Sequence, residues 1–193
     1  MRVHVDRAAI TAAFAAVQGN PAFAESSSLV ASGKLPVEMI QAMSLRPELL
    51  VAFGATSEAV YPGGIVERRV KELIILEASR HNGCQFCTDS HVSIARTLRI
   101  GDEGGDPIAL LDRPELLTER ERLAIEYVRA AQRDSNRIGD EFFERLRRAY
   151  ADPEIVELTA MIGLITMLNL FNNCLRITYR GEYDGEMSAR GRC

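Results

Sequence analysis

Residues 66–98 read VERRVKELIILEASRHNGCQFCTDSHVSIARTL, and this stretch predicts two helices joined by a tight turn. Apolar residues recur at helical spacing from Val66 to about His81, which is typical of an amphipathic helix. Asn82-Gly83 then supplies the residue types that commonly end a helix. A second helix is predicted from Cys84 to about Leu98. An antiparallel return would bring the two helices side by side.

Helical spacing of apolar residues continues through most of the chain, whereas the alternating pattern of strands is missing. We therefore predict an all-α fold. Further helices are expected at about 7–17, shortly after Pro36, and at about 47–60, 118–133, 140–150 and 153–175. Thr118 and Glu121 form a predicted capping box. Residues 25–34 are expected to be loop or weak helix, and 101–107 a solvated loop or a lid.

The bulk composition favours one compact domain and gives no sign of a nucleic-acid or membrane partner. The chain has 193 residues, of which 47% are apolar, enough for a sizeable core. It carries 23 basic and 27 acidic residues, so its charge does not attract a polyanion. The longest apolar candidate for a membrane span, residues 155–171, is interrupted by Glu157 and Asn169. With no signal-type leader in view, we expect a cytoplasmic protein.

The four cysteines are too sparse for a disulfide scaffold. Cys84 and Cys87 stand three positions apart and form the one pair with a recognisable spacing. Cys174 lies in an apolar segment and is interpreted as a small buried hydrophobe. Cys193 is the last residue and is expected on a tail.

The pair becomes chemically informative together with His91 and Glu72. Positions three, four and seven apart share one face of a helix, so Cys84, Cys87 and His91 are predicted to line one stripe. A helix N-terminus and a neighbouring imidazole both favour the reactive thiolate. Glu72, on the preceding helix, is in a position to orient that imidazole. A second cysteine makes oxidation of the first reversible. The set indicates thiol redox chemistry.

Other interpretations of these residues stay open. Cys, Cys and His are also zinc ligands, and Glu72 could be the fourth. Glu72 could equally be a surface residue paired with Arg68 or Arg69. The asparagines Asn169, Asn172 and Asn173 are interpreted as hydrogen-bonded packing or oligomer contacts. No G-x-G-x-x-G phosphate cradle is present in the sequence, so we expect no organic cofactor.

At these residues the sequence resembles the alkylhydroperoxidase D-like and carboxymuconolactone decarboxylase superfamily, in its peroxidase-related branch. The resemblance rests on Glu72, on residues 82–87 (NGCQFC) and on Ser90-His91, with the Gly63-Gly64 turn and residues 68–73 before them. Residues 46–50 and 168–173 also match, so the resemblance covers roughly residues 36–177. We accordingly divide the chain into an N-terminal extension helix (1–20), a helical domain of this type (21–180) and a C-terminal tail (181–193).

The resemblance implies a single-domain helical bundle that forms homo-oligomers, often trimers or hexamers. It also implies roles: Cys87 attacks a hydroperoxide, Cys84 resolves the product as a disulfide, and His91 and Glu72 relay protons. A dithiol partner, lipoyl or thioredoxin-like, would restore the reduced form.

One position departs from the family pattern, because Phe86 stands where its best-known peroxidases have a second histidine. This departure weakens the relay and favours slower turnover or a sensing role. We predict a thiol-dependent peroxidase. The alternatives are a redox sensor or zinc-binding protein without turnover, and a lactone decarboxylase, which would not rely on the cysteine pair.

Overall fold

The computed structural model describes residues 1–101 and 105–183, and helices are the only regular secondary structure within them, as predicted. The α-helices are α1 (Arg7–Ala16), α2 (Ala24–Ala31), α3 (Glu38–Met43), α4 (Pro47–Ala59), α5 (Arg68–His81), α6 (Gln85–Thr97), α7 (Pro107–Leu110), α8 (Glu119–Asp134), α9 (Asp140–Leu146) and α10 (Asp152–Leu175). Short 3-10 helices cover Pro21–Phe23, Pro114–Leu116 and Ser135–Arg137.

The helices predicted from the sequence are found with ends shifted by few residues. The capping box of α8 is confirmed: the Glu121 N–H donates to Thr118 Oγ1 at 3.3 Å, and the Thr118 N–H donates to Glu121 Oε2 at 2.8 Å. Of residues 25–34, expected as loop or weak helix, the first seven lie in α2 (Ala24–Ala31). Residues 102–104 of the predicted loop or lid (101–107) lie outside the described residues. So do residues 184–193 of the predicted tail, which include Cys193.

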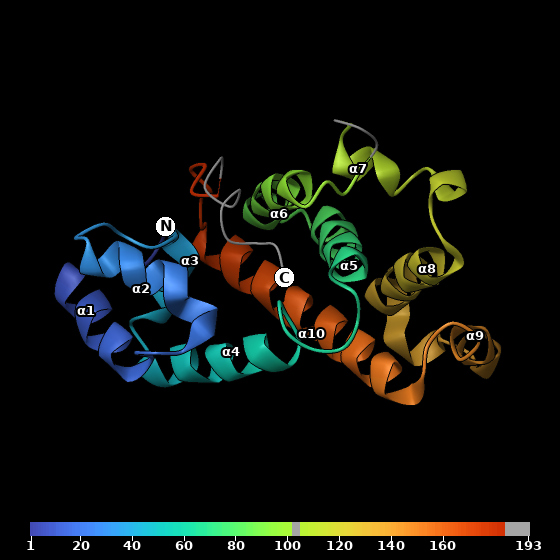
Figure 1. Ribbon diagram of the computed structural model, residues 1–193, viewed down its shortest axis with the longest axis horizontal. Coiled ribbons are helices and arrows are strands. Elements are labelled where there is room, and N and C mark those ends of the chain that lie inside the picture. Colours follow the sequence, from blue (N-terminus) through green and yellow to red (C-terminus); the bar gives the residue numbers. More distant parts are fainter. Residues whose placement is uncertain (102–104, 184–193) are drawn as a thin grey trace.

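Helix α5 lies at the centre of the molecule. Every residue from Val70 to Ser79 is buried, because α5 packs against α6, α8 and α10 on different sides. Helices α1 to α4 gather at one end, α8 and α9 lie toward the other, and α10 runs between them (Figure 1). The largest core cluster combines residues of α1, α4, α5, α6, α8 and α10. Helix α1 thus packs into the main core, while the division at residue 20 stays a prediction.

Helix α10 is long and apolar enough to cross a membrane by length and composition alone. The same test is passed by core helices of globular proteins, and 39% of the tested window is buried inside the molecule. One side of α10 packs on α5, α6 and α8. Its outer side carries exposed apolar residues, among them Val156 and Leu170.

Candidate functional site

The turn between α5 and α6 places both cysteines at a helix N-terminus. Gly83 has a φ of 61°, a left-handed conformation that glycine adopts without the penalty of a Cβ atom. The chain then enters α6 with Cys84 as the N-cap, whose sulfur accepts the Cys87 N–H at 3.3 Å. The two sulfur atoms form a disulfide, with Cα atoms 5.4 Å apart. The pair lies where the α6 dipole stabilises negative charge on sulfur.

His91 lies on α6 one turn beyond Cys87, and Glu72 faces it from α5. His91 Nδ1 is 2.8 Å from Glu72 Oε2. The antiparallel return expected from the sequence thus brings together two residues from successive helices. Cys87 Sγ, in contrast, has its polar contact with the side chain of Asn172 on α10.

Tyr61 and Arg68 complete a hydrogen-bond network around the Glu72 carboxylate. The Tyr61 hydroxyl donates to Glu72 Oε1 at 2.7 Å, and Arg68 Nε donates to the same oxygen at 2.7 Å. Arg68 Nη2 donates to the Tyr61 hydroxyl oxygen at 2.6 Å. The Tyr61 hydroxyl also lies 3.3 Å from His91 Nδ1. From the sequence, Arg68 was interpreted as a surface partner of Glu72, and Tyr61 was assigned only to the turn before the helix.

This network keeps Glu72 charged although its side chain is fully buried. Burial by itself raises the pKa of Glu72, but the charge and hydrogen bond of His91, followed by Arg68 and Tyr61, lower it below its usual value. For Tyr61, burial and the Glu72 charge raise the pKa well above the usual value. The pair therefore stays as a carboxylate and a neutral phenol around neutral pH.

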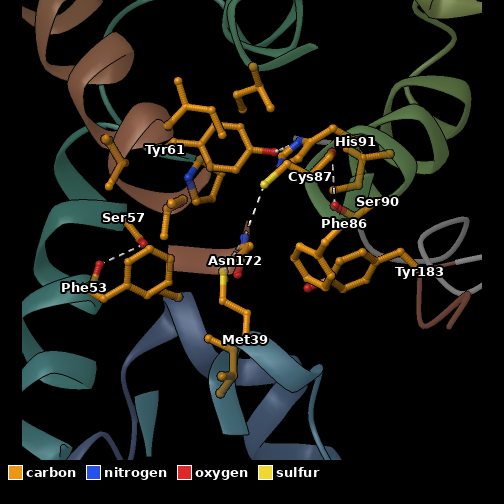
Figure 2. A pocket seen from close by; sticks show the side chains of 18 of the residues that line it. Met39, Phe53, Ser57, Tyr61, Phe86, Cys87, Ser90, His91, Asn172 and Tyr183 are labelled. Atoms are coloured by element: carbon orange, nitrogen blue, oxygen red, sulfur yellow. Dashed lines mark hydrogen bonds between the residues drawn. The ribbon is translucent and has the colours of Figure 1, made fainter. Parts of the chain in front are cut away.

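Cys87 and His91 face a cavity of about 180 Å³ (Figure 2). Most of its lining is apolar or aromatic, and it comes from α3, α4, α5, α6 and α10 as well as the segment 22–26. Its lining includes Met39, Ser57, Tyr61, Phe86, Ser90 and Asn172. Cys84 does not line this cavity, so Cys87 is the cysteine that a bound small molecule would meet.

Phe86, at the position of the missing histidine, serves as packing. Its ring lies edge-on to Tyr179, with centroids 6.2 Å apart. Tyr179 in turn packs on Tyr183, which also lines the cavity. Phe86 therefore belongs to an apolar wall of the cavity that is formed partly by the segment after α10.

A buried ion pair fixes the loop that carries Tyr61. Lys71 Nζ lies 2.6 Å from Glu157 Oε1, and Lys71 also donates to the Gly63 carbonyl. Glu157 accepts the N–H groups of Ile65 at 2.7 Å and Val66 at 3.0 Å. A Cβ atom at Gly63 would overlap the Glu58 carbonyl, at 1.8 Å. Glycine at 63 and the Lys71–Glu157 pair thus hold the loop that presents Tyr61 to Glu72.

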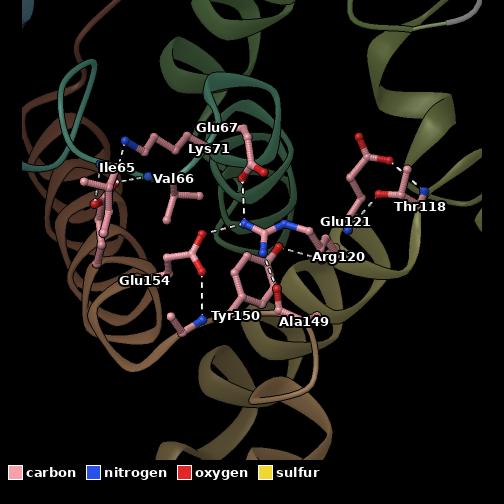
Figure 3. Close-up of polar contacts among 12 residues, drawn as sticks. Ile65, Val66, Glu67, Lys71, Thr118, Arg120, Glu121, Ala149, Tyr150 and Glu154 are labelled. Carbon is pink, nitrogen blue, oxygen red and sulfur yellow. Dashed lines mark hydrogen bonds and ion pairs between the residues drawn. The ribbon is translucent and has the colours of Figure 1, made fainter.

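The start of α5 is also bound to its neighbours (Figure 3). Arg120 Nη2 on α8 reaches Glu67 Oε2 at 2.9 Å and Glu154 Oε1 at 2.7 Å, and so joins α5, α8 and α10. The Tyr150 hydroxyl donates to the Arg120 carbonyl at 2.7 Å. These contacts fix the helix end next to Arg68.

Cys174 and two asparagines of α10 can be compared with their sequence predictions. Cys174 was expected to be buried and is exposed, because it faces outward on the last turn of α10. The asparagines are hydrogen-bonded as predicted: Asn169 Nδ2 donates to Ser79 Oγ at 3.1 Å, and Asn173 Nδ2 to the Asn82 carbonyl at 3.0 Å. Among residues 1–101 and 105–183, no group of three or more His, Cys, Asp or Glu side chains is arranged to hold a metal ion.

Comparison with known proteins assigns the family. Residues 47–131 match the model of the carboxymuconolactone decarboxylase family. The chain is 31% identical to a structure from Agrobacterium tumefaciens, of unknown function and suggested to be the antioxidant defence protein AhpD. That match covers 72% of this chain and 95% of the other, with a TM-score of 0.64. The chain belongs to the alkylhydroperoxidase D-like and carboxymuconolactone decarboxylase superfamily.

Two further relatives extend the comparison. An uncharacterized peroxidase-related protein from Ralstonia eutropha JMP134, described as an alkylhydroperoxidase AhpD core, shares the superfamily fold with a TM-score of 0.73 at 19% identity. The match covers 94% of this chain and 93% of that one. Uncharacterized protein YdfG of Bacillus subtilis (strain 168) is 29% identical over 105 residues, which are 54% of this chain and 71% of YdfG. The superfamily membership predicted from the sequence is thus confirmed.

Proposed function

We propose that this protein is a thiol-dependent peroxidase that reduces hydroperoxides through the Cys84–Cys87 pair. The observation that carries the proposal is the position of Cys87, at a helix N-terminus, facing an apolar cavity beside a His91 whose Nδ1 is bound to Glu72. A nucleophile, a proton carrier and a space for the substrate therefore meet at one point.

The first step oxidises Cys87. Its thiolate attacks the terminal oxygen of the hydroperoxide, the S–O bond forms as the O–O bond breaks, and sulfur gives up two electrons. The leaving alkoxide takes a proton and departs as an alcohol. His91 supplies that proton from Nε2, because Nδ1 is held by the Glu72 carboxylate.

The second step closes the disulfide. The Cys84 sulfur attacks the Cys87 sulfenic acid, the S–S bond forms, and the hydroxyl leaves with the Cys84 proton as water. A dithiol then reduces the disulfide and is itself oxidised to a disulfide. Because the pair is buried and Cys87 is reached through the cavity, a slender dithiol such as a lipoyl group fits this access better than a thioredoxin-like protein.

The lining of the cavity favours a hydroperoxide with an apolar substituent over hydrogen peroxide. Burial of an apolar substituent against the apolar and aromatic lining lowers the free energy of binding. Hydrogen peroxide has no such substituent and would leave this lining in contact with water. Phe86, packed against Tyr179, cannot carry a proton as a histidine at this position would. We therefore expect a modest rate of peroxide turnover.

The proposal includes a homo-oligomer in the cytoplasm. The outer side of α10 presents Val156, Met167 and Leu170 in one stripe with the small residues Ala160 and Gly163, a surface suited to another copy of the chain. A cytoplasmic location supplies the reducing conditions under which a redox-cycling pair is regenerated.

Mass spectrometry after alkylation of free thiols tests the function. Reduced protein is treated with one equivalent of cumene hydroperoxide, in wild type and in Cys87→Ser. We expect wild type to lose two alkylation sites to a Cys84–Cys87 disulfide and to form cumyl alcohol, and Cys87→Ser to form none. Disulfide formation without peroxide-dependent turnover in the presence of dihydrolipoamide would favour a redox sensor. Thiols that remain alkylatable would overturn the proposal.

A further inference from the structure

Asn172 has an unusual position at the wall of the cavity. Its side chain lies on α10, is 2% exposed, and borders the cavity next to Cys87. Its Nδ2 is 3.2 Å from Cys87 Sγ and 3.6 Å from Met39 Sδ. Its Oδ1 is buried and has no hydrogen-bond partner among the residues that the structure describes. Figure 2 shows this amide directed at the Cys87 sulfur.

The chemistry of the neighbours fixes the orientation of the amide. A disulfide sulfur and a thioether sulfur carry no proton, so each can only accept a hydrogen bond. The NH₂ group of Asn172 therefore faces the two sulfurs, and the carbonyl oxygen is left as a free acceptor. A buried acceptor without a partner is costly, and such groups in folded proteins call for a ligand, a water or a catalytic role.

Three hydroxyl groups that line the cavity already donate hydrogen bonds within the protein. The Ser90 hydroxyl donates to the Cys87 carbonyl at 3.2 Å, and the Ser57 hydroxyl donates to the Phe53 carbonyl at 2.8 Å. The Tyr61 hydroxyl donates to Glu72. Asn172 Oδ1, by contrast, is a buried acceptor on a residue that lines the cavity, and it has no hydrogen-bond partner among the residues that the structure describes.

We propose that Asn172 is a catalytic residue of the peroxide reaction, binding the Cys87 thiolate through Nδ2–H and the hydroperoxide O–H through Oδ1. The proposal rests on the proposed function and adds a residue to it. Both contacts come from one planar amide, so the terminal peroxide oxygen would be held beside the sulfur that attacks it.

The two contacts act at different stages of the oxidation. The N–H to sulfur bond is charge-assisted once the thiol ionises, and it favours the thiolate before any substrate binds. The carbonyl keeps the hydroperoxide oriented with its O–H oxygen toward Sγ. The S–O bond then forms, the O–O bond breaks, and the alkoxide receives its proton from His91. Asn172 thereby stabilises the thiolate at a site where Phe86, which has no side-chain donor, cannot do so.

The first experiment measures the thiolate alone and needs no peroxide. Cys84, Cys174 and Cys193 are replaced by serine, so that Cys87 is the remaining thiol, and its alkylation rate by iodoacetamide is followed against pH. We expect Asn172→Leu to raise the Cys87 pKa by about 1 to 2 units. Asn172→Asp should raise it further, because a carboxylate repels the thiolate. An unchanged pKa in both variants would overturn the thiolate half of the proposal.

Asn173→Ala is the matched control, because this neighbouring asparagine is exposed and bonds to the Asn82 carbonyl outside the cavity. It should leave the Cys87 pKa at its unsubstituted value. Circular dichroism and thermal unfolding of each variant establish that α10 is intact. A pKa shift in Asn173→Ala equal to that in Asn172→Leu would reveal a general disturbance of α10 and contradict the assignment.

The second experiment measures the Cys87 sulfenic acid formed with cumene hydroperoxide, at a pH where Cys87 is fully ionised in every variant. We expect Asn172→Leu to react about tenfold more slowly even there, because the Oδ1 contact is gone. Equal rates would show that Oδ1 holds only a water, and would overturn the substrate half. If the protein with Asn172 intact does not react with the peroxide, both the proposed peroxidase function and the role of Oδ1 in substrate binding are wrong. The first experiment still decides whether Asn172 stabilises the Cys87 thiolate.

Discussion

His91 Nδ1 lies 2.8 Å from Glu72 Oε2, and this contact couples the two helices that carry the proposed chemistry. Because the carboxylate occupies Nδ1, proton exchange with the cavity is left to Nε2. Glu72 is itself held by Tyr61 and Arg68, so the orientation of the imidazole depends on a network that reaches back to the loop before α5.

The Glu72 carboxylate should be required for the peroxide reaction. Replacing it in Glu72→Gln keeps the shape of the side chain but removes the carboxylate that holds His91 Nδ1. Since acid–base groups contribute roughly 10²- to 10⁴-fold, we expect a rate loss of about 10²-fold or more with cumene hydroperoxide. Stopped-flow kinetics on reduced protein measures it.

Glu77→Gln is the control for that loss. Glu77 is also a buried glutamate on α5, but it pairs with Arg80 and Arg129 at 2.7 and 2.9 Å, and it does not line the cavity. This variant should lose stability and keep its peroxide rate. Equal rate losses in both variants would mean that Glu72 acts through the fold of α5.

The Tyr61 hydroxyl should contribute to the rate by positioning Glu72. Tyr61→Phe removes a donor to Glu72 and an acceptor for Arg68. We expect about a tenfold lower peroxide rate and an activity profile whose acidic limb moves to higher pH, because Glu72 loses a hydrogen bond that lowers its pKa. Tyr150→Phe also loses a donated hydrogen bond, but Tyr150 does not line the cavity, so this variant should keep the wild-type pH profile.

The buried pair Lys71–Glu157 should dominate the stability of the Tyr61 loop. Both side chains are under 10% exposed, so Lys71→Met leaves an unpaired buried carboxylate and should cost about 3 to 5 kcal/mol of unfolding free energy. Urea unfolding measures this cost. Removing Arg46 from its exposed pair with Glu48 should cost about 1 kcal/mol or less. Similar costs for the two changes would contradict the structural role of Lys71.

The same pair should make stability fall in acid. Burial raises the pKa of Glu157, but the N–H groups of Ile65 and Val66 together with Lys71 bring it below the ordinary 4.5. A carboxyl group with a lowered folded-state pKa adds stability above its unfolded pKa, and this stability is lost as the pH falls through the folded value. Unfolding free energy should therefore drop below about pH 4.5, with a shallower slope in Glu157→Gln. An unchanged slope would argue against this linkage.

The exposed stripe of α10 should set the oligomeric state. We expect Val156→Glu and Leu170→Glu to convert the oligomer into smaller species, because a charge would be buried against another copy. Light scattering coupled to size-exclusion chromatography measures the mass. Leu116→Glu, a change at an exposed leucine outside α10, should leave the mass unaltered. A monomeric wild-type protein would contradict the proposed assembly.

The sequence by itself determined the helical class, most helix boundaries and the superfamily, because these depend on local patterns. Apolar spacing, Gly83 after α5, and the Thr118–Glu121 capping box act within a few residues of each other. The NGCQFC motif in the same way placed the cysteines at the start of α6. The pairing of Glu72 with His91 was one of three interpretations of Glu72, and the structure shows it together with the Arg68 pair.

The tertiary structure decided which residues surround that core motif. Asn172 falls in the stretch 168–173 that resembles the superfamily, but neither it nor Tyr61 was predicted at the site. They reach it from a loop before α5 and from the distant helix α10. The exposure of Cys174 could not be predicted, because apolar spacing on α10 does not reveal which side meets the core. The burial of Lys71 on α5 depends on its ion pair with the distant Glu157. Contacts between segments far apart in the chain depend on the packing of whole helices, and that packing minimises free energy over the entire core.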